Sequence, residues 1–354
     1  MKSKTIFIIA AIMVFTSALS STGLVGASVQ QPNKPEPAAP GKQQREKKPA
    51  EDVPGDDQTI KLGTQLVTVP FNVTDKKNRY INELTRDDLE VLEDNKPQQI
   101  FSFTRQTDLP ITIAMLIDIS GSQEYTLSEE KDAGLRFLQK VLRPKKDLGA
   151  IVTFEHESVL VQDLTDNIQK LERAIQDVRI SVVPGRTGPG FPPTGTPPIN
   201  PSGSGSTAIY DSIYSVSSEL LRREAGRRVI ILLTDGADTS SSVKMRDAIE
   251  RTWRSEIIVY AIGIGDPRFG VDKGTLKKIA SETGGRAFFP DNNGDLDRAF
   301  TQIDEDLRTQ YILAYTSTNG ARDASFRTIQ LRVKNKKELT VRHRRGYFAP
   351  KAAS

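Results

Sequence analysis

The sequence predicts a doubly wound α/β domain with a mostly parallel sheet, inserted into a small antiparallel β-sandwich built from the two chain ends. Two observations support this prediction. The middle of the chain, about residues 110–309, alternates short runs of Ile, Val and Leu with segments of helical period. Such alternation is typical of a parallel sheet covered on both faces. Both ends instead carry short segments in which apolar and polar residues alternate, as in half-buried strands.

The N-terminus has the pattern of a secretory signal peptide, residues 1–27. Lys2 and Lys4 precede an apolar stretch that runs from Ile6 to about residue 19, and small residues follow as far as Ala27. The stretch is shorter than the roughly 20 residues of a membrane-spanning helix, so we expect cleavage after Ala27. The chain has no cysteine for lipid attachment, and no later segment reads as a membrane span. We therefore expect a secreted or periplasmic protein.

Residues 28–62 are expected to form a disordered tether, because they are rich in Pro, Lys, Glu, Gln and Asp and nearly lack bulky apolar side chains. The net charge of +4 is too small to indicate nucleic-acid binding by a chain of 354 residues. Between Arg322 and Lys351, however, ten Lys or Arg stand against two acidic residues. We expect solvated strand faces here, and the alternative is weak contact with a polyanion such as a cell-envelope polymer.

Residues 63–109 are predicted to supply the first half of the sandwich. Every second residue from Val67 to Val73 is apolar, which indicates a strand with one buried face. Two more strands are expected at DLEVLED and QQIFSFTR, joined by a turn. Residues 310–350 show the same alternation. Neither end has enough strands for a stable sandwich alone, so we expect the two ends to pair.

The α/β domain, residues 110–309, is predicted from four buried strands and the helices between them. The strands are expected at 111–117, 148–154, 227–234 and 256–265. The helices are expected at 128–142, 166–180, 207–223, 243–254, 272–283 and 295–308. Ligands of doubly wound domains bind at the carboxyl ends of the strands, so we expect the functional residues there.

A Pro- and Gly-rich segment, residues 183–206, interrupts this domain and runs directly into Thr207. It holds seven prolines and six glycines. Loops of this length are uncommon in compact domains, and they are usually functional or disordered. Phe191 and Arg186 are the side chains in it that could contact a partner. The alternative is passive disorder, and the sequence does not decide between the two.

Five side chains with oxygen atoms fall at the carboxyl ends of the predicted strands. Asp118, Ser120 and Ser122 follow the first strand at alternating positions, so an extended loop would point them the same way. Asp235 follows a later strand, and Thr207 begins a helix. Because all five offer oxygen and none offers nitrogen or sulfur, the set suits Mg²⁺, Mn²⁺ or Ca²⁺.

These five positions resemble the metal-ion-dependent adhesion site (MIDAS) of von Willebrand factor type A domains. They have the family's order, Asp-x-Ser-x-Ser, then a distant Thr, then an Asp within Thr-Asp-Gly. The flanking segments LEVLEDNKPQQIFSF and RRGYFAP are similar to a group of secreted bacterial proteins related to type A domains. The resemblance implies one divalent cation, foremost Mg²⁺, with an open position for an Asp or Glu of a partner protein. The two aspartates balance the charge of one such cation.

Three further residues are expected to support these loops without binding the cation directly: Gly121, Gly236 and Asp238. The alternative for the Asp118 loop is a strand cap that holds no metal. A cap alone would not need Thr207 and Asp235 as well.

We predict a non-enzymatic, adhesion-type module, and the sequence leaves two alternative functions open. A metal-dependent phosphoester or peptide hydrolase would need a general base, for which Glu124 and Glu155 are the candidates. A scaffold of an envelope complex would instead bind through the basic C-terminal strands and leave the metal site silent. The histidines, His156 and His343, fall in different predicted domains, so we expect them to share no site.

Overall fold

The structure, a computed structural model, describes residues 65–105, 108–180, 206–265, 270–336 and 338–352. The expected signal peptide and tether, and residues 183–205 of the Pro- and Gly-rich segment with Arg186 and Phe191, lie outside these residues. Among the residues described, no helix combines the length and the apolar character needed to cross a membrane.

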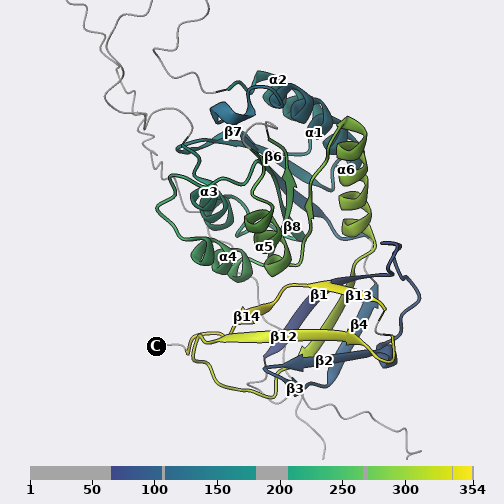
Figure 1. The fold of residues 1–354 in the computed structure, drawn as a ribbon. Coiled ribbons are helices and arrows are strands. Elements are labelled where there is room, and N and C mark those ends of the chain that lie inside the picture. The colour runs from purple at the N-terminus through teal and green to yellow at the C-terminus, as the bar shows by residue number, and fades with distance from the viewer. Residues whose placement is uncertain (1–64, 106–107, 181–205, 266–269, 337, 353–354) are drawn as a thin grey trace, which may run out of the picture. The chain divides into compact units, whose positions relative to one another are not determined.

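The α/β domain has a six-stranded sheet in the order β10-β9-β8-β5-β6-β7. Figure 1 shows this sheet among its helices, with β6, β7 and β8 labelled. All neighbouring strands in it are parallel except β7, which runs antiparallel to β6. Its strands are β5 (Ile111–Asp118), β6 (Leu148–Phe154), β7 (Ser158–Thr165), β8 (Arg227–Thr234), β9 (Ile257–Gly263) and β10 (Ala287–Phe288). Its helical segments are η2 (Gly121–Gln123), α1 (Leu127–Val141), α2 (Ile168–Asp177), α3 (Ile209–Ser215), η4 (Val216–Leu220), α4 (Met245–Arg254), α5 (Lys273–Thr283) and α6 (Asn293–Arg308).

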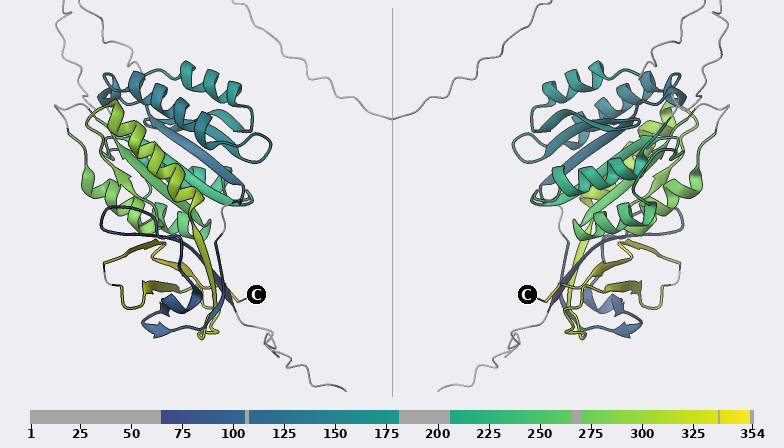
Figure 2. Two further views of the ribbon diagram at one scale, coloured as in Figure 1. Left: turned by 90° about the vertical axis from the view of Figure 1, so that its right-hand side faces the viewer. Right: turned by 90° about the vertical axis from the view of Figure 1, so that its left-hand side faces the viewer.

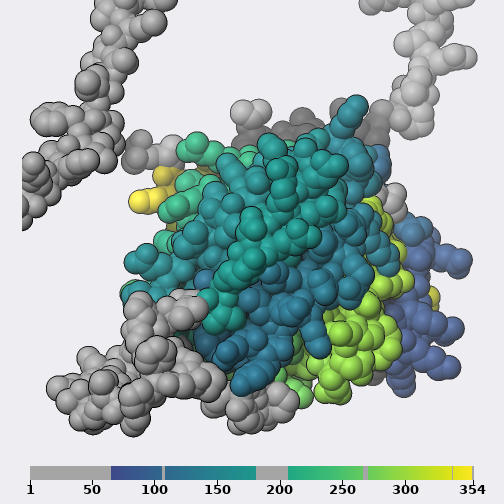
Figure 3. Space-filling model, turned by 90° about the horizontal axis from the view of Figure 1, so that it is seen from above, coloured from purple at the N-terminus to yellow at the C-terminus, as the bar shows by residue number. Residues whose placement is uncertain are grey.

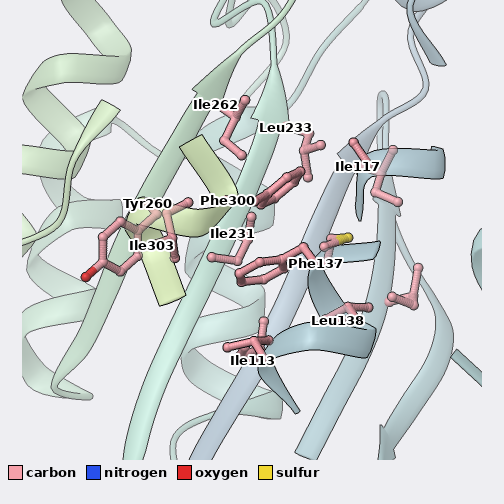
Figure 4. Close-up of a cluster of buried hydrophobic side chains, with 14 of the residues drawn as sticks. Ile113, Ile117, Phe137, Leu138, Ile231, Leu233, Tyr260, Ile262, Phe300 and Ile303 are labelled. Carbon is pink, nitrogen blue, oxygen red and sulfur yellow. The ribbon is translucent and has the colours of Figure 1, made fainter. Parts of the chain in front are cut away.

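Helices cover both faces of this sheet, which explains why its central strands are apolar throughout. Ile113, Met115 and Ile117 of β5 share one core cluster with residues of α1, α2 and α6. Ala114 and Leu116 point to the other face, into a cluster with residues of α3, α4 and α5. Figure 4 shows the first cluster, in which Phe137 of α1 and Phe300 of α6 stack with ring centroids 4.7 Å apart. The prediction of a doubly wound sheet is confirmed.

The two chain ends build the sandwich, as predicted (Figure 2). One sheet has the order β13-β1-β11-β4 and the other β14-β12-β2-β3. The N-terminal elements are β1 (Leu66–Thr74), η1 (Arg86–Asp88), β2 (Leu89–Glu93), β3 (Lys96–Pro97) and β4 (Ile100–Arg105). The C-terminal strands are β11 (Tyr311–Thr316), β12 (Phe326–Val333), β13 (Thr340–His343) and β14 (Gly346–Phe348). Each sheet mixes strands from both ends, because β1 pairs with β11 and β2 pairs with β12.

The α/β domain enters and leaves the sandwich at one place. Strand β4 ends at Arg105 and β11 begins at Tyr311, and these two residues are direct partners in an antiparallel pair. Because the inserted domain connects the ends of two paired strands, it does not interrupt the hydrogen bonding between β4 and β11.

Three elements of the α/β domain differ from the prediction. The two-residue strand β10 was not predicted. Strand β7 was not predicted, and it lies at the sheet edge with Val159, Leu160 and Val161 exposed. The segment predicted as one helix over 207–223 forms the short α3 followed by a π-helical segment, η4.

The basic C-terminal strands do not present all their cations to solvent. Arg327 of β12 is fully buried, and Arg344 is 9% exposed. The expectation of solvated faces is therefore wrong for these two side chains, whereas Arg332 and Lys334 are exposed as expected.

Candidate metal site

The loop after β5 holds the first three predicted ligands. Asp118, the last residue of β5, is fully buried, and its Oδ1 accepts a hydrogen bond from the backbone N–H of Ser120 (2.9 Å). Its Oδ2 accepts from Thr234 Oγ1 at the end of β8 (2.6 Å). The hydroxyl oxygens of Ser120 and Ser122 lie 3.0 Å apart. The structure thus holds the Asp118 carboxylate between two strands and brings the two serine hydroxyls together.

Of the two glycines predicted to support the site, Gly236 has a structural requirement for glycine and Gly121 does not. Gly236, directly after Asp235, has a φ of +87°, a backbone conformation that favours glycine. A Cβ atom there would lie 2.9 Å from Leu276 Cγ and 3.0 Å from the carbonyl oxygen of Asp272. At Gly121, no described atom beyond its chain neighbours lies within 4 Å of a Cβ position. Steric crowding therefore explains the glycine at 236 but not the one at 121.

Thr207 is tied to the loop that follows Asp235. It is 3% exposed, its N–H donates to Thr239 Oγ1 (2.8 Å), and its carbonyl accepts from the N–H of Thr239 (2.9 Å). Asp238 Oδ1 accepts from the N–H groups of Ile209 (2.8 Å) and Tyr210 (3.3 Å) at the start of α3. Asp238 therefore braces the segment that carries Thr207.

Two residues that the sequence analysis did not single out, Gln123 and Glu130, adjoin the candidate ligands. Oriented with its nitrogen toward α1, the buried Gln123 amide donates to Glu130 Oε1 (3.0 Å) and accepts from the N–H of Asp235 (3.2 Å). Glu130 is 1% exposed, and its Oε2 has no hydrogen-bond partner among the described residues. Glu130 lies three residues after Leu127 and seven before Phe137, on the apolar face of α1. A charged residue on that face is the sequence signal that could have identified it.

The carboxylates of this site repel one another in a buried environment. Burial raises the pKa of Asp118 to about 6; the charge of Asp235 adds to the rise, and hydrogen bonds from Ser120 and Thr234 oppose it. Burial also raises the pKa of Glu130 to about 8, and the charges of Asp118 and Asp235 add to that rise. Within the described part of the chain, none of these three carboxylates forms an ion pair. Negative charge is therefore concentrated here without a protein cation to balance it.

The donor set fits a hard divalent cation. The two aspartates offer charged oxygens, and the hydroxyls of Ser120, Ser122 and Thr207 offer neutral ones, which are the ligands that Mg²⁺, Mn²⁺ and Ca²⁺ accept. Among the residues that the structure describes, no cluster of three or more His, Cys, Asp or Glu could hold a metal ion. A site here would thus depend on the hydroxyls as well as on the carboxylates.

Of the two candidate general bases and the two histidines, Glu124 and His156 are exposed. The carbonyl of Glu155 accepts the N–H of Ala208 (2.7 Å). His343 lies in the sandwich, where its Nε2 accepts the backbone N–H of Leu331 (3.3 Å).

Several solved structures are similar to this chain at low identity. Proximal thread matrix protein 1 (PTMP1) from the mussel byssus has a TM-score of 0.47 and 19% identity, covering 61% of this chain and 51% of the mussel protein. This chain therefore matches about half the length of the mussel protein. Another structure of PTMP1 is described as having a zinc-occupied MIDAS motif. A von Willebrand factor type A protein from Catenulispora acidiphila has a TM-score of 0.46 and 13% identity, covering 82% of this chain and 75% of that chain.

Comparison with curated protein sequences gives no match. Two family models do match, and both describe the von Willebrand factor type A domain. One covers residues 113–237 and the other covers residues 197–302, so together they extend over nearly the whole α/β domain. The chain belongs to the von Willebrand factor type A domain family, through its residues 113–302.

Proposed function

We propose that this protein is a non-enzymatic binding module that captures an acidic side chain of a partner protein through a divalent cation. The ligands would be Asp118, Ser120, Ser122, Thr207 and Asp235, with Mg²⁺ as the foremost candidate and Mn²⁺ or Ca²⁺ as alternatives. Residues 113–302 form a von Willebrand factor type A domain, a family of adhesion-type modules. The metal, the ligand set and the partner are our proposal.

The observation that supports this proposal best is the buried, uncompensated negative charge at the carboxyl ends of β5 and β8. Asp118 and Asp235 are 0% and 5% exposed, and the pKa of Asp118 is raised by burial and by the charge of Asp235. Burying charge without a partner is costly, so groups arranged in this way usually pair or bind a metal. A divalent cation would relieve the repulsion.

The chain's own residues would orient the ligands. Thr234 and the Ser120 N–H hold the Asp118 carboxylate by hydrogen bonds of 2.6 and 2.9 Å. Gln123 holds the Asp235 backbone, and Thr239 holds Thr207. When bound, the cation would supply a Lewis-acidic position for a carboxylate oxygen. Because three of the five ligands are neutral hydroxyls, that position would still favour a further negative charge.

The first test is metal-dependent stabilisation. Mg²⁺ or Mn²⁺ should raise the melting temperature of the parent protein. At a metal concentration of 100 times Kd, the free energy of unfolding should increase by about 2.7 kcal/mol. The double variant Ser120→Ala/Ser122→Ala should lose this shift and keep its metal-free melting temperature within a few degrees. Ser128→Ala, an exposed serine of α1, is the matched control and should keep the full shift. Equal shifts in the double variant and the parent would contradict the ligand assignment.

The partner is tested by retention of proteins from a cell-envelope extract on the immobilised protein, with Mg²⁺ and then with EDTA. Retained proteins should elute with EDTA and should not bind the Asp118→Ala variant. Retention that survives both treatments would favour the scaffold function instead. Export is part of the proposal, supported by the composition of residues 1–27, and a mature N-terminus at Ser28 would verify it.

A further inference from the structure

A second candidate binding surface lies at the other end of the parallel sheet. A groove of about 680 Å³ is lined by the residues after η4, the end of α4, the start of β1 and the segment from β14 to Lys351. Strand β8 begins beside this groove and ends at Thr234, next to Asp235. The groove therefore lies at the amino ends of the strands, away from the candidate metal site.

This groove, which we call the junction groove, is strongly cationic. Its lining includes Glu256 as its acid and six cationic side chains, Arg222, Arg228, Arg251, Arg254, Arg344 and Lys351. Arg228 and Arg344 share Glu256, at 2.9 and 3.4 Å. Arg254 pairs with Glu250 at 2.7 Å. Within the described residues, the other three cations form no ion pair, so the groove holds charge that an anionic ligand would balance.

Residues that line the junction groove and an adjoining cavity carry buried polar atoms without partners among the described residues. The cavity, of about 130 Å³, and the groove are both lined by Thr68, Arg228 and Arg344. The Nε atoms of Arg228 and Arg344, and Oε1 of Gln310 in the cavity lining, are buried without a hydrogen-bond partner among the described residues. Buried polar atoms are almost always paired in proteins, so this junction has unused donors and an unused acceptor.

We propose that the junction groove binds an extended acidic segment of a partner protein. Guanidinium groups pair with carboxylates through two parallel hydrogen bonds. Trp253, Phe348 and Leu66 add apolar surface to the lining, which a peptide can cover and a phosphate polymer cannot. A peptide backbone also offers both N–H and C=O groups, whereas an ionised phosphate polymer offers acceptors alone. The mixture of donors, acceptor and apolar surface in this junction therefore favours a peptide.

Fluorescence anisotropy with a labelled decapeptide of alternating Glu and Ala tests this proposal on the whole protein. EDTA is present throughout, so the candidate metal site does not contribute and its failure would not affect the result. The parent should bind this peptide, bind its Gln-for-Glu counterpart at least tenfold more weakly, and lose affinity as salt is raised.

The groove variant is Arg222→Glu/Lys351→Glu, since both residues are exposed and unpaired in the described structure. The control is Lys170→Glu/Arg173→Glu on exposed positions of α2, which changes the net charge by the same amount. Affinity should fall at least tenfold in the groove variant and stay within twofold in the control. Equal losses in both variants, or no binding by the parent, would overturn the proposal. Inorganic polyphosphate that binds more tightly than the peptide, with the same variant dependence, would replace it by a phosphate-polymer site.

Discussion

Glu130 is an acidic side chain placed where a helix normally buries an apolar one. It lies in the first turn of α1, its Oε2 has no partner among the described residues, and its Oε1 accepts from Gln123. Burial, and then the charges of Asp118 and Asp235, raise its pKa to about 8. The folded protein therefore keeps a proton on Glu130 that the unfolded chain, with a pKa near 4.5, has already lost.

The pH dependence of stability follows from this difference. Between about pH 4.5 and pH 8 the native state binds the extra proton, so metal-free stability falls as the pH rises through this window. Glu130→Gln should remove this contribution. Its stability relative to the parent should rise by about 1.5 kcal/mol between about pH 6.5 and pH 8, as judged by urea unfolding in EDTA. Above pH 6 the similar contribution of Asp118 is largely complete.

The neighbouring residue provides the control for this prediction. Glu129→Gln removes an exposed carboxylate from the same helical turn and should change the pH profile of the parent only slightly, because its charge contributes least of the three that raise the pKa of Glu130. If the stability of Glu130→Gln ran parallel to that of the parent across this range, Glu130 would not hold the proton assigned to it.

At the scale of elements, a buried polar network joins four strands of the sandwich. Glu93 of β2 accepts hydrogen bonds from Tyr315 of β11 (2.7 Å) and Tyr347 of β14 (2.8 Å) through Oε2, and from Ser317 through Oε1 (2.6 Å). Arg327 of β12, fully buried, brings Nη1 to 3.6 Å from Glu93 Oε1. The network thus connects strands of both sheets and of both chain ends.

Removing the cation of this network should be strongly destabilising. Arg327→Met keeps much of the apolar stem but leaves the Glu93 carboxylate buried and unpaired, so we expect a loss of about 3 kcal/mol in urea unfolding. Arg332→Met on the exposed side of the same strand should change stability by less than about 0.5 kcal/mol. A loss below about 1 kcal/mol for Arg327→Met would mean that water compensates Glu93.

Element type was predictable where the apolar period was clear. The alternation from Val67 to Val73 gave strand β1, and the apolar runs gave β5, β6, β8 and β9. Strand β7 was missed because its apolar residues, Val159 to Val161, are consecutive and exposed. They show neither the two-residue alternation of a half-buried strand nor the 3.6-residue period of a helix. Its pairing with β6, and not its own sequence pattern, makes it a strand.

At the scale of the whole molecule, the α/β domain and the sandwich contact each other through particular side chains. Trp253 of α4 stacks on Phe326 of β12, with ring centroids 4.5 Å apart. Asp306 of α6 accepts hydrogen bonds from Asn72 (3.0 Å) and Tyr80 (2.7 Å). Figure 3 views the molecule from the top of Figure 1, where segments of the α/β domain make up most of the face. The α/β domain and the sandwich have separate hydrophobic cores, so the contacts between them add to these cores and do not replace them.

The insertion can be tested by excision. Residues 106–310 are replaced by Asn-Gly, since Arg105 and Tyr311 are paired in antiparallel strands that a two-residue turn can join. The shortened protein should give β-type circular dichroism and unfold cooperatively in urea. The urea midpoint of its unfolding should be lower than the midpoint of the sandwich in the full chain, because Phe326 loses its contact with Trp253 and Tyr80 loses its hydrogen bond to Asp306. A chain without a cooperative transition would show that the sandwich needs the inserted domain.

The sequence by itself determined the fold class and proposed the five metal ligands, because these depend on local period and on residue types at strand ends. The tertiary structure alone decided which buried groups lack a partner. Gln123, Glu130, Glu93 and Arg327 received their roles from burial and from contacts between segments far apart in the chain. The junction groove likewise gathers its cations from α4, from the segment between η4 and the start of β8, and from the C-terminal end of the chain. Charge and hydrogen-bonding capacity are properties of single residues, but whether they are satisfied depends on which other segments the fold brings close.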